Sequence, residues 1–172
     1  IKVNRQKDLA LIQIRTNTDL VALKLGSMDR VRVGMPVHAI GHPLNHYWTY
    51  TKGFVSQIRE NFSWADVSNP GGSKHRATVI QTQTPINPGN SGGPLFTNDS
   101  DLIGINSFRN EEADGINFAI AIDEVKQFLR DIPSPPKPQS GYPHPLSEYA
   151  AESIDTDKDG KMDLYGFDTD DN

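Results

Sequence analysis

The sequence is organised around Asn87-Pro88-Gly89-Asn90-Ser91-Gly92-Gly93-Pro94, in which one serine lies among glycines and between two prolines. A serine hydroxyl is a weak nucleophile. It needs a base that takes its proton and backbone N–H groups that hold the oxyanion formed on attack. Glycines allow the backbone to curl until such N–H groups converge. We therefore predict that Ser91 is a nucleophile and that the N–H groups of Gly89 and Ser91 form an oxyanion hole.

Two other interpretations fit the same residues. Glycine, asparagine, serine and proline are the usual residues of ordinary surface turns, which carry no chemistry. The Gly-x-Ser-x-Gly pattern is also typical of the nucleophile elbow of α/β-hydrolases, but that elbow requires a helix directly after the serine. The run Pro94-Leu95-Phe96 and the polar residues 97–100 that follow it break any amphipathic helical period. The sequence therefore favours a strand, a turn and a second strand.

The flanking segments, residues 79–86 before the turn and 101–107 after it, identify a family. The run from Ile80 to Asn106 closely resembles the trypsin-like serine proteases of the high-temperature-requirement (HtrA) branch. Members of this branch carry Gly-Asn-Ser-Gly-Gly-Pro where digestive trypsins have Asp before the serine. Three further segments match the family in the same order: Asp8-Leu9-Ala10-Leu11-Ile12, Val33-Gly34 through Ala39-Ile40-Gly41-His42-Pro43, and Gly115-Ile116-Asn117-Phe118-Ala119-Ile120.

The resemblance implies an all-β fold of two β-barrels with the active site between them. The second barrel is expected to be complete from Val31 onward, whereas only the end of the first barrel is expected. A C-terminal helix should follow, because Asp123 is a good N-cap and apolar residues recur at helical spacing after it. The expected strands of the second barrel are 36–40, 53–58, 77–82, 94–96, 102–105 and 116–120, and the apolar helix face is Val125, Phe128, Leu129 and Ile132.

The resemblance assigns Asp8 to the catalytic site. In the family this aspartate accepts a hydrogen bond from the catalytic histidine, fixes its tautomer and stabilises the imidazolium. A buried strand, Leu9–Ile14, is expected directly after it.

The family's catalytic histidine precedes this aspartate, whereas all five histidines of the sequence follow it: His38, His42, His46, His75 and His144. We therefore expect this chain alone to be inactive, with the base supplied from upstream. The first three of these histidines would share one face of a helix and suggest a metal site, but Gly41 and Pro43 oppose a helix there.

The resemblance also aligns the substrate pocket with Ile86 and with the strand Asn106-Ser107-Phe108. No acidic residue occurs at these positions. Because burying an unpaired cation is costly, we expect a preference for small or medium apolar side chains over Lys or Arg.

Beyond the protease domain, residues 1–132, the composition changes. Residues 133–146 are rich in proline and should form an extended linker. Residues 147–172 contain Asp-rich segments with a period of 13, which resemble EF-hand-like or thrombospondin type 3-like calcium loops. The predicted calcium ligands are Asp155, Asp157, Asp159, the carbonyl of Lys161, and Asp163. The bidentate Glu of a full EF-hand is absent, and an acidic disordered tail is the alternative.

Composition limits the partners. The net charge of -5 argues against nucleic acid. No apolar run approaches the roughly 20 residues needed to cross a bilayer. The first residues do not resemble a signal peptide, and with no cysteine the redox compartment is not encoded. The expected partners are protein or peptide substrates, with a homo-oligomer possible for the full-length protein.

Three functions compete at this point. The first is a periplasmic or secreted serine endopeptidase. The second is a protease-like binding module that has lost its base, and the third places the function in the calcium repeats, with the barrel as a scaffold. Retention of both Ser91 and Asp8 argues against the second, since a decayed site has no reason to keep both.

Overall fold

The computed structural model describes residues 2–14, 20–43, 48–65, 74–109 and 115–130. These ranges contain nine strands, a short 3-10 helix (Met28–Arg30) and one α-helix. The strands are β1 (Lys2–Asn4), β2 (Leu9–Leu11), β3 (Lys24–Leu25), β4 (Pro36–Gly41), β5 (Thr49–Ala65), β6 (Lys74–Thr82), β7 (Pro94–Phe96), β8 (Asp101–Arg109) and β9 (Asn117–Ala121), and the helix is α1 (Ile122–Arg130).

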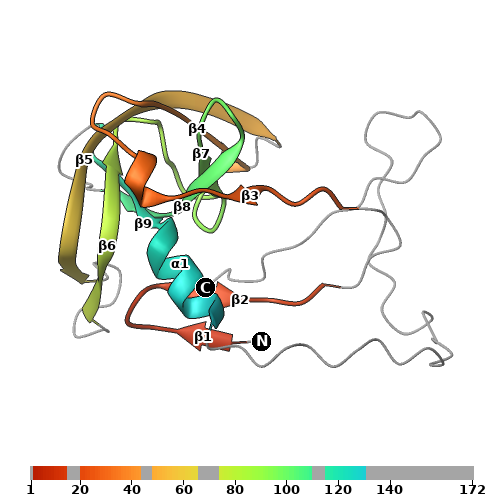
Figure 1. Ribbon diagram of the computed structural model, residues 1–172, viewed down its shortest axis with the longest axis vertical. Coiled ribbons are helices and arrows are strands. Elements are labelled where there is room, and N and C mark those ends of the chain that lie inside the picture. Colours follow the sequence, from red (N-terminus) through yellow and green to blue (C-terminus); the bar gives the residue numbers. More distant parts are fainter. Residues whose placement is uncertain (1, 15–19, 44–47, 66–73, 110–114, 131–172) are drawn as a thin grey trace, which may run out of the picture. The chain divides into compact units, whose positions relative to one another are not determined.

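Strands β4 to β9 close into an antiparallel barrel (Figure 1). In this ring β4 lies between β5 and β7, and β6 lies between β5 and β9. Strand β8 pairs with both β7 and β9, and this double pairing closes the ring. The predicted all-β class and second barrel are therefore confirmed.

Strand β5 pairs with two neighbouring strands of the barrel. Its first part, residues 49–54, pairs with β4, and the part from Val55 onward pairs with β6. The register shifts between Val55 and Gln57 and again between Arg59 and Phe62. Such bulges bend a strand and increase its twist, so one long strand turns the corner of the barrel. The sequence predicted only a strand at residues 53–58 here, because the polar residues on both sides of this segment do not show the apolar pattern of a buried strand.

One hydrophobic cluster fills the barrel. Every strand of the ring contributes to it, since alternate residues of a strand point to one face. Its buried members are Val31, Val37, Ala39, Val55, Ile80, Leu95, Ile103, Ala119 and Ala121.

Helix α1 packs outside the barrel on a second cluster. Val125 and Phe128 are buried there, and Leu129 is half-buried, as the spacing predicted, whereas Ile132, the fourth residue of the predicted face, lies outside the described residues. The helix begins at Ile122, so Asp123 lies in the first turn and is not the N-cap. A carboxylate in the first turn still interacts favourably with the helix dipole. No helix in the described ranges is long and apolar enough to cross a membrane.

Strands β1 and β2 form a separate hairpin beside α1 (Figure 1). The prediction of a buried strand Leu9–Ile14 is wrong for most of its length. The strand ends at Leu11, only Leu9 is buried, and Ile12 and Ile14 are 68% and 63% exposed. The reason is that the other described residues place no second layer over this part of the hairpin.

Candidate active site

The turn between β6 and β7 places Ser91 on the surface of the barrel. The N–H of Asn90 donates to the carbonyl of Asn87 (2.9 Å), and the N–H of Gly93 donates to the carbonyl of Asn90 (3.0 Å). Gly89 has φ +99°, which only glycine adopts readily. In the described part of the chain the N–H groups of Gly89 and Ser91 donate to no protein acceptor, and their role as an oxyanion hole stays a prediction.

Hydrogen bonds to β8 fix the far side of this turn. The N–H of Gly92 donates to the carbonyl of Asn106 (2.8 Å), and the N–H of Asn106 donates to the carbonyl of Gly93 (2.9 Å). The side chain of Asn106 is buried and donates to the carbonyl of Pro94 (3.2 Å). Ser91 therefore has a defined position relative to β8.

Two glycines allow the backbone of the turn to pack closely. Asn90 is buried, and a Cβ at Gly41 would lie 2.2 Å from its Oδ1. A Cβ at Gly89 would lie 2.2 Å from the carbonyl oxygen of His42, whose N–H donates to Gly89 O (3.0 Å). Gly41 belongs to a segment that the sequence analysis matched to the family, but its packing role was not foreseen.

Ser107 brings the two predicted catalytic residues together. The hydroxyl of Ser91 donates to the carbonyl of Ser107 (2.8 Å). The hydroxyl of Ser107 in turn donates to the carboxylate of Asp8. Asp8 lies between β1 and β2 with φ +54°, a conformation that aspartate tolerates better than most residues. The hairpin and the barrel therefore meet at a site that contains both Asp8 and Ser91.

The rings of two histidines, His38 and His75, form hydrogen bonds to groups other than Ser91. In His38, Nδ1 hydrogen-bonds to the hydroxyl of Tyr50 (2.5 Å) and Nε2 to Oδ1 of Asn98 (2.6 Å). In His75, Nδ1 donates to the carbonyl of Arg5 (2.7 Å). Neither ring is therefore placed to take the proton of Ser91.

The remaining predicted substrate residues lie near the turn but are largely covered. Ile86 is only 3% exposed. Phe108 is half-buried, and its ring stacks on Trp64 (4.5 Å between centroids) and Phe118 (4.6 Å). The roles of Ile86, Asn106, Ser107 and Phe108 in substrate binding remain predictions.

The predicted calcium ligands, Asp155, Asp157, Asp159, Lys161 and Asp163, lie outside the described residues, as does the predicted linker. In the part of the chain that the structure describes, no group of three or more His, Cys, Asp or Glu side chains could hold a metal ion.

One ion pair near Asp8 was not predicted from the sequence. Glu124 of α1 is bonded to Lys7, the residue before Asp8 (2.5 Å). Burial raises the pKa of Glu124, but hydrogen bonds from the Lys7 ammonium and the Thr78 N–H outweigh it, and the pKa is lowered overall. Nothing in the sequence indicates this pair, because its members are far apart in the chain.

A closed antiparallel barrel that presents a glycine-framed serine, with an aspartate held against the neighbouring strand, defines the class of the trypsin-like serine proteases. The trypsin-like peptidase domain matches residues 1–105, and the chain belongs to this family.

Named relatives extend this assignment. The chain is 40% identical over 129 residues to "Serine protease HTRA4" of Mus musculus, covering 75% of this chain and 25% of that protein. It is 35% identical over 145 residues to "Probable periplasmic serine endoprotease DegP-like" of Pseudomonas fluorescens, covering 83% of this chain and 28% of that protein. The chain thus spans between a quarter and a third of these relatives.

A solved structure gives the same result. A variant of the HtrA-type protease AlgW with a decapeptide superposes with a TM-score of 0.59 at 31% identity, covering 73% of this chain and 36% of the other. Together these similarities support an HtrA-type serine protease.

Proposed function

We propose that this chain carries the nucleophile, the orienting aspartate and the oxyanion hole of a serine endopeptidase. The observation that carries the proposal is the contact of Ser91 and Asp8 with one residue, Ser107. A surface turn without chemistry has no reason to lie against an aspartate from a separate hairpin. In the mechanism, Ser91 attacks the scissile carbonyl, and the N–H groups of Gly89 and Ser91 stabilise the tetrahedral oxyanion.

The general base in this proposal is a histidine that precedes Ile1 in a longer protein. Asp8 would orient its imidazole and stabilise the imidazolium. The Ser91 hydroxyl donates to a carbonyl oxygen, which cannot remove its proton, so the proposal requires a separate base.

A first barrel completed by other residues is part of the same proposal. Apolar side chains on and after the hairpin are exposed, among them Val3, Ile12, Ile14 and Val21. Further strands that completed a first barrel would bury these side chains.

The substrates are proposed to be proteins or peptides cleaved after small or medium apolar residues. The apolar side chains of Ile86 and Phe108, and the lack of an acidic residue at the aligned positions, support this preference. The periplasmic relative supports a periplasmic or extracellular location.

A structural calcium site in residues 147–172 is proposed separately, on the spacing of its aspartates alone. Four carboxylates repel one another until a cation neutralises them. Calorimetry of the 172-residue chain with calcium, with Asp157→Asn as the matched variant, tests it. Saturable binding at millimolar calcium that the variant loses is expected, and its absence rejects the site.

Proteolysis is tested in a protein that includes the upstream residues, with an unfolded protein as substrate. We expect cleavage that Ser91→Ala abolishes and that Ser63→Ala, an exposed serine of β5, leaves intact. The 172-residue chain alone should not turn over substrate, since loss of the base costs several orders of magnitude. Cleavage that persists in Ser91→Ala would exclude the proposal. Saturable peptide binding without cleavage would instead support a binding module.

A further inference from the structure

The turn that carries Asp8 is held from two sides. Strand β6 provides one side: the N–H of Arg76 donates to the carbonyl of Gln6 (2.7 Å), and Nδ1 of His75 donates to the carbonyl of Arg5 (2.7 Å). These bonds fix the residues at the start of the turn. They do not reach the peptide that links Lys7 to Asp8.

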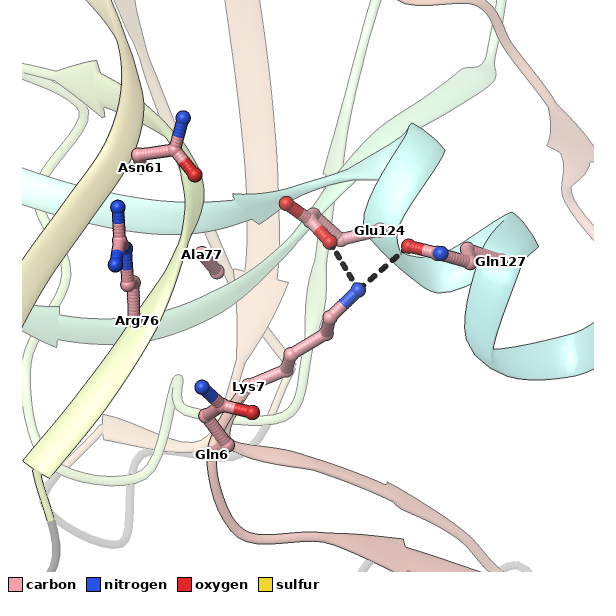
Figure 2. Close-up of a pocket in the computed structure, with 7 residues that line it drawn as sticks. All are labelled: Gln6, Lys7, Asn61, Arg76, Ala77, Glu124 and Gln127. Carbon is pink, nitrogen blue, oxygen red and sulfur yellow. Dashed lines mark hydrogen bonds and ion pairs between the residues drawn. The ribbon is translucent and has the colours of Figure 1, made fainter.

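Helix α1 provides the other side through Lys7. Figure 2 shows the Lys7 ammonium between two side chains of the helix, with bonds to Glu124 Oε2 (2.5 Å) and Gln127 Oε1 (2.6 Å). The other carboxylate oxygen of Glu124 accepts the N–H of Thr78 in β6 (2.8 Å). Glu124 therefore joins the helix, the barrel and the turn at one point.

The Lys7–Glu124 pair differs from an ordinary surface pair. Its side chains are only 20% and 16% exposed, whereas the Lys126–Asp123 pair on the same helix is longer (4.0 Å) and more exposed. Exposed pairs contribute little, whereas breaking a partly buried pair leaves a charge without its partner. The pair lines a pocket of about 440 Å³ with Gln6, Asn61 and Arg76 (Figure 2), so water reaches one side of it.

Asp8 depends on this support because of its backbone. Aspartate tolerates positive φ better than most residues, but the conformation still costs energy, so contacts around the turn help to hold it. Asp8 has φ +54°, and its carboxylate must still meet the hydroxyl of Ser107. Lys7 is its immediate neighbour, so a shift of Lys7 changes the direction of the Asp8 side chain.

We propose that Lys7 and Glu124 are positioning residues that hold Asp8 against Ser107, so that α1 controls the geometry of the active site. This inference rests on the proposed serine protease function. In a protease the pair would act on the chemical step, since Asp8 orients the base and does not bind the substrate.

The first test measures the geometry without any activity. Amide hydrogen exchange by NMR is compared between the 172-residue chain and the variants Lys7→Met, Glu124→Gln and Lys7→Arg. Glu124→Gln keeps an oxygen for the Thr78 N–H but removes the charge. The Lys7 amide donates to both the carbonyl (3.2 Å) and the side-chain Oδ1 (3.0 Å) of Asn4. We expect its protection to fall roughly tenfold or more in the first two variants, because both hydrogen bonds break when the turn opens. Lys7→Arg should retain it.

Lys126→Met is the matched control on the same helix, because it removes a lysine from a pair that does not contact the turn. Barrel amides, such as those of β4, should be unchanged in every variant. Equal loss of protection throughout the chain would indicate a purely structural role and overturn the proposal. An unchanged Lys7 amide in both Lys7→Met and Glu124→Gln would do the same.

The second test uses the longer protein that contains the base. Lys7→Met and Glu124→Gln should lower kcat by about ten- to a hundredfold, as small misplacements of catalytic groups do, with KM nearly unchanged. Lys7→Arg should restore most of kcat. A rise in KM with kcat unchanged would overturn the positioning role. If the unsubstituted protein hydrolyses nothing, the protease function fails, and the exchange measurement still decides whether the pair holds the turn.

Discussion

Replacing Gly89 with alanine should destabilise the protein and disable Ser91, and the structure allows both effects to be estimated. At φ +99° a Cβ is disfavoured by about 1–2 kcal/mol, the usual cost of a left-handed conformation. The new methyl would also lie 2.2 Å from the carbonyl oxygen of His42, 2.8 Å from its carbonyl carbon and 3.1 Å from Cα of Pro43. These are backbone atoms that cannot rotate away, so overpacking adds roughly 1–3 kcal/mol.

Gly34→Ala is the matched control for this experiment. Gly34 has φ +83°, but a Cβ there would have no atom within 4 Å. This substitution therefore measures the conformational cost without the steric overlap. In urea unfolding of the 172-residue chain, we expect Gly89→Ala to lower the free energy of unfolding by about 1–3 kcal/mol more than Gly34→Ala, with m unchanged.

The functional part of the prediction concerns the oxyanion hole. Relief of the overlap requires the turn to move away from His42, which displaces the N–H of Gly89. Loss of one such donor lowers kcat by on the order of 10² to 10³. In the longer protein Gly89→Ala should therefore lose peptide hydrolysis, whereas Gly34→Ala should keep it. Equal stability of the two variants, or full activity in Gly89→Ala, would refute the steric argument.

Three further outcomes are expected. Ser107→Ala should lower kcat in the longer protein about tenfold, because Asp8 loses one charge-assisted hydrogen bond, and peptide kinetics with Ser63→Ala as control measures this. The pKa of Glu124 is lower in the folded than in the unfolded chain, so its contribution to stability is present above the unfolded pKa near 4.5 and is lost as pH falls through the folded pKa. We therefore expect that, as pH falls below about 4.5, urea unfolding shows a smaller loss of stability in Glu124→Gln than in the unsubstituted chain. Ile86→Asp should shift cleavage toward substrates with Lys or Arg, which competition between two peptides detects, and an unchanged preference would remove Ile86 from the pocket.

The sequence by itself determined the family and the barrel, and it predicted Ser91 as the nucleophile. These conclusions rest on local patterns: a serine framed by glycines, apolar strands, and apolar residues at helical spacing that predicted the packing of Val125 and Phe128. Such patterns are readable because each reflects the conformation of a few consecutive residues. The same locality explains the error at Leu9–Ile14. An apolar strand is buried only if another layer covers it, and the sequence of a strand does not contain that layer.

Only the tertiary structure decided how distant residues meet at the site. The sequence predicted Ser107 only as a substrate contact, which stays a prediction, and the structure adds that its hydroxyl donates to Asp8 and its carbonyl accepts from Ser91. Lys7 and Glu124 have no motif, and their contact exists because the β1–β2 hairpin lies beside α1. The need for glycine at position 41 arises likewise from the approach of Asn90. Hydrogen bonds and steric contacts depend on positions in space, so residues from separate elements acquire these roles only when the barrel closes.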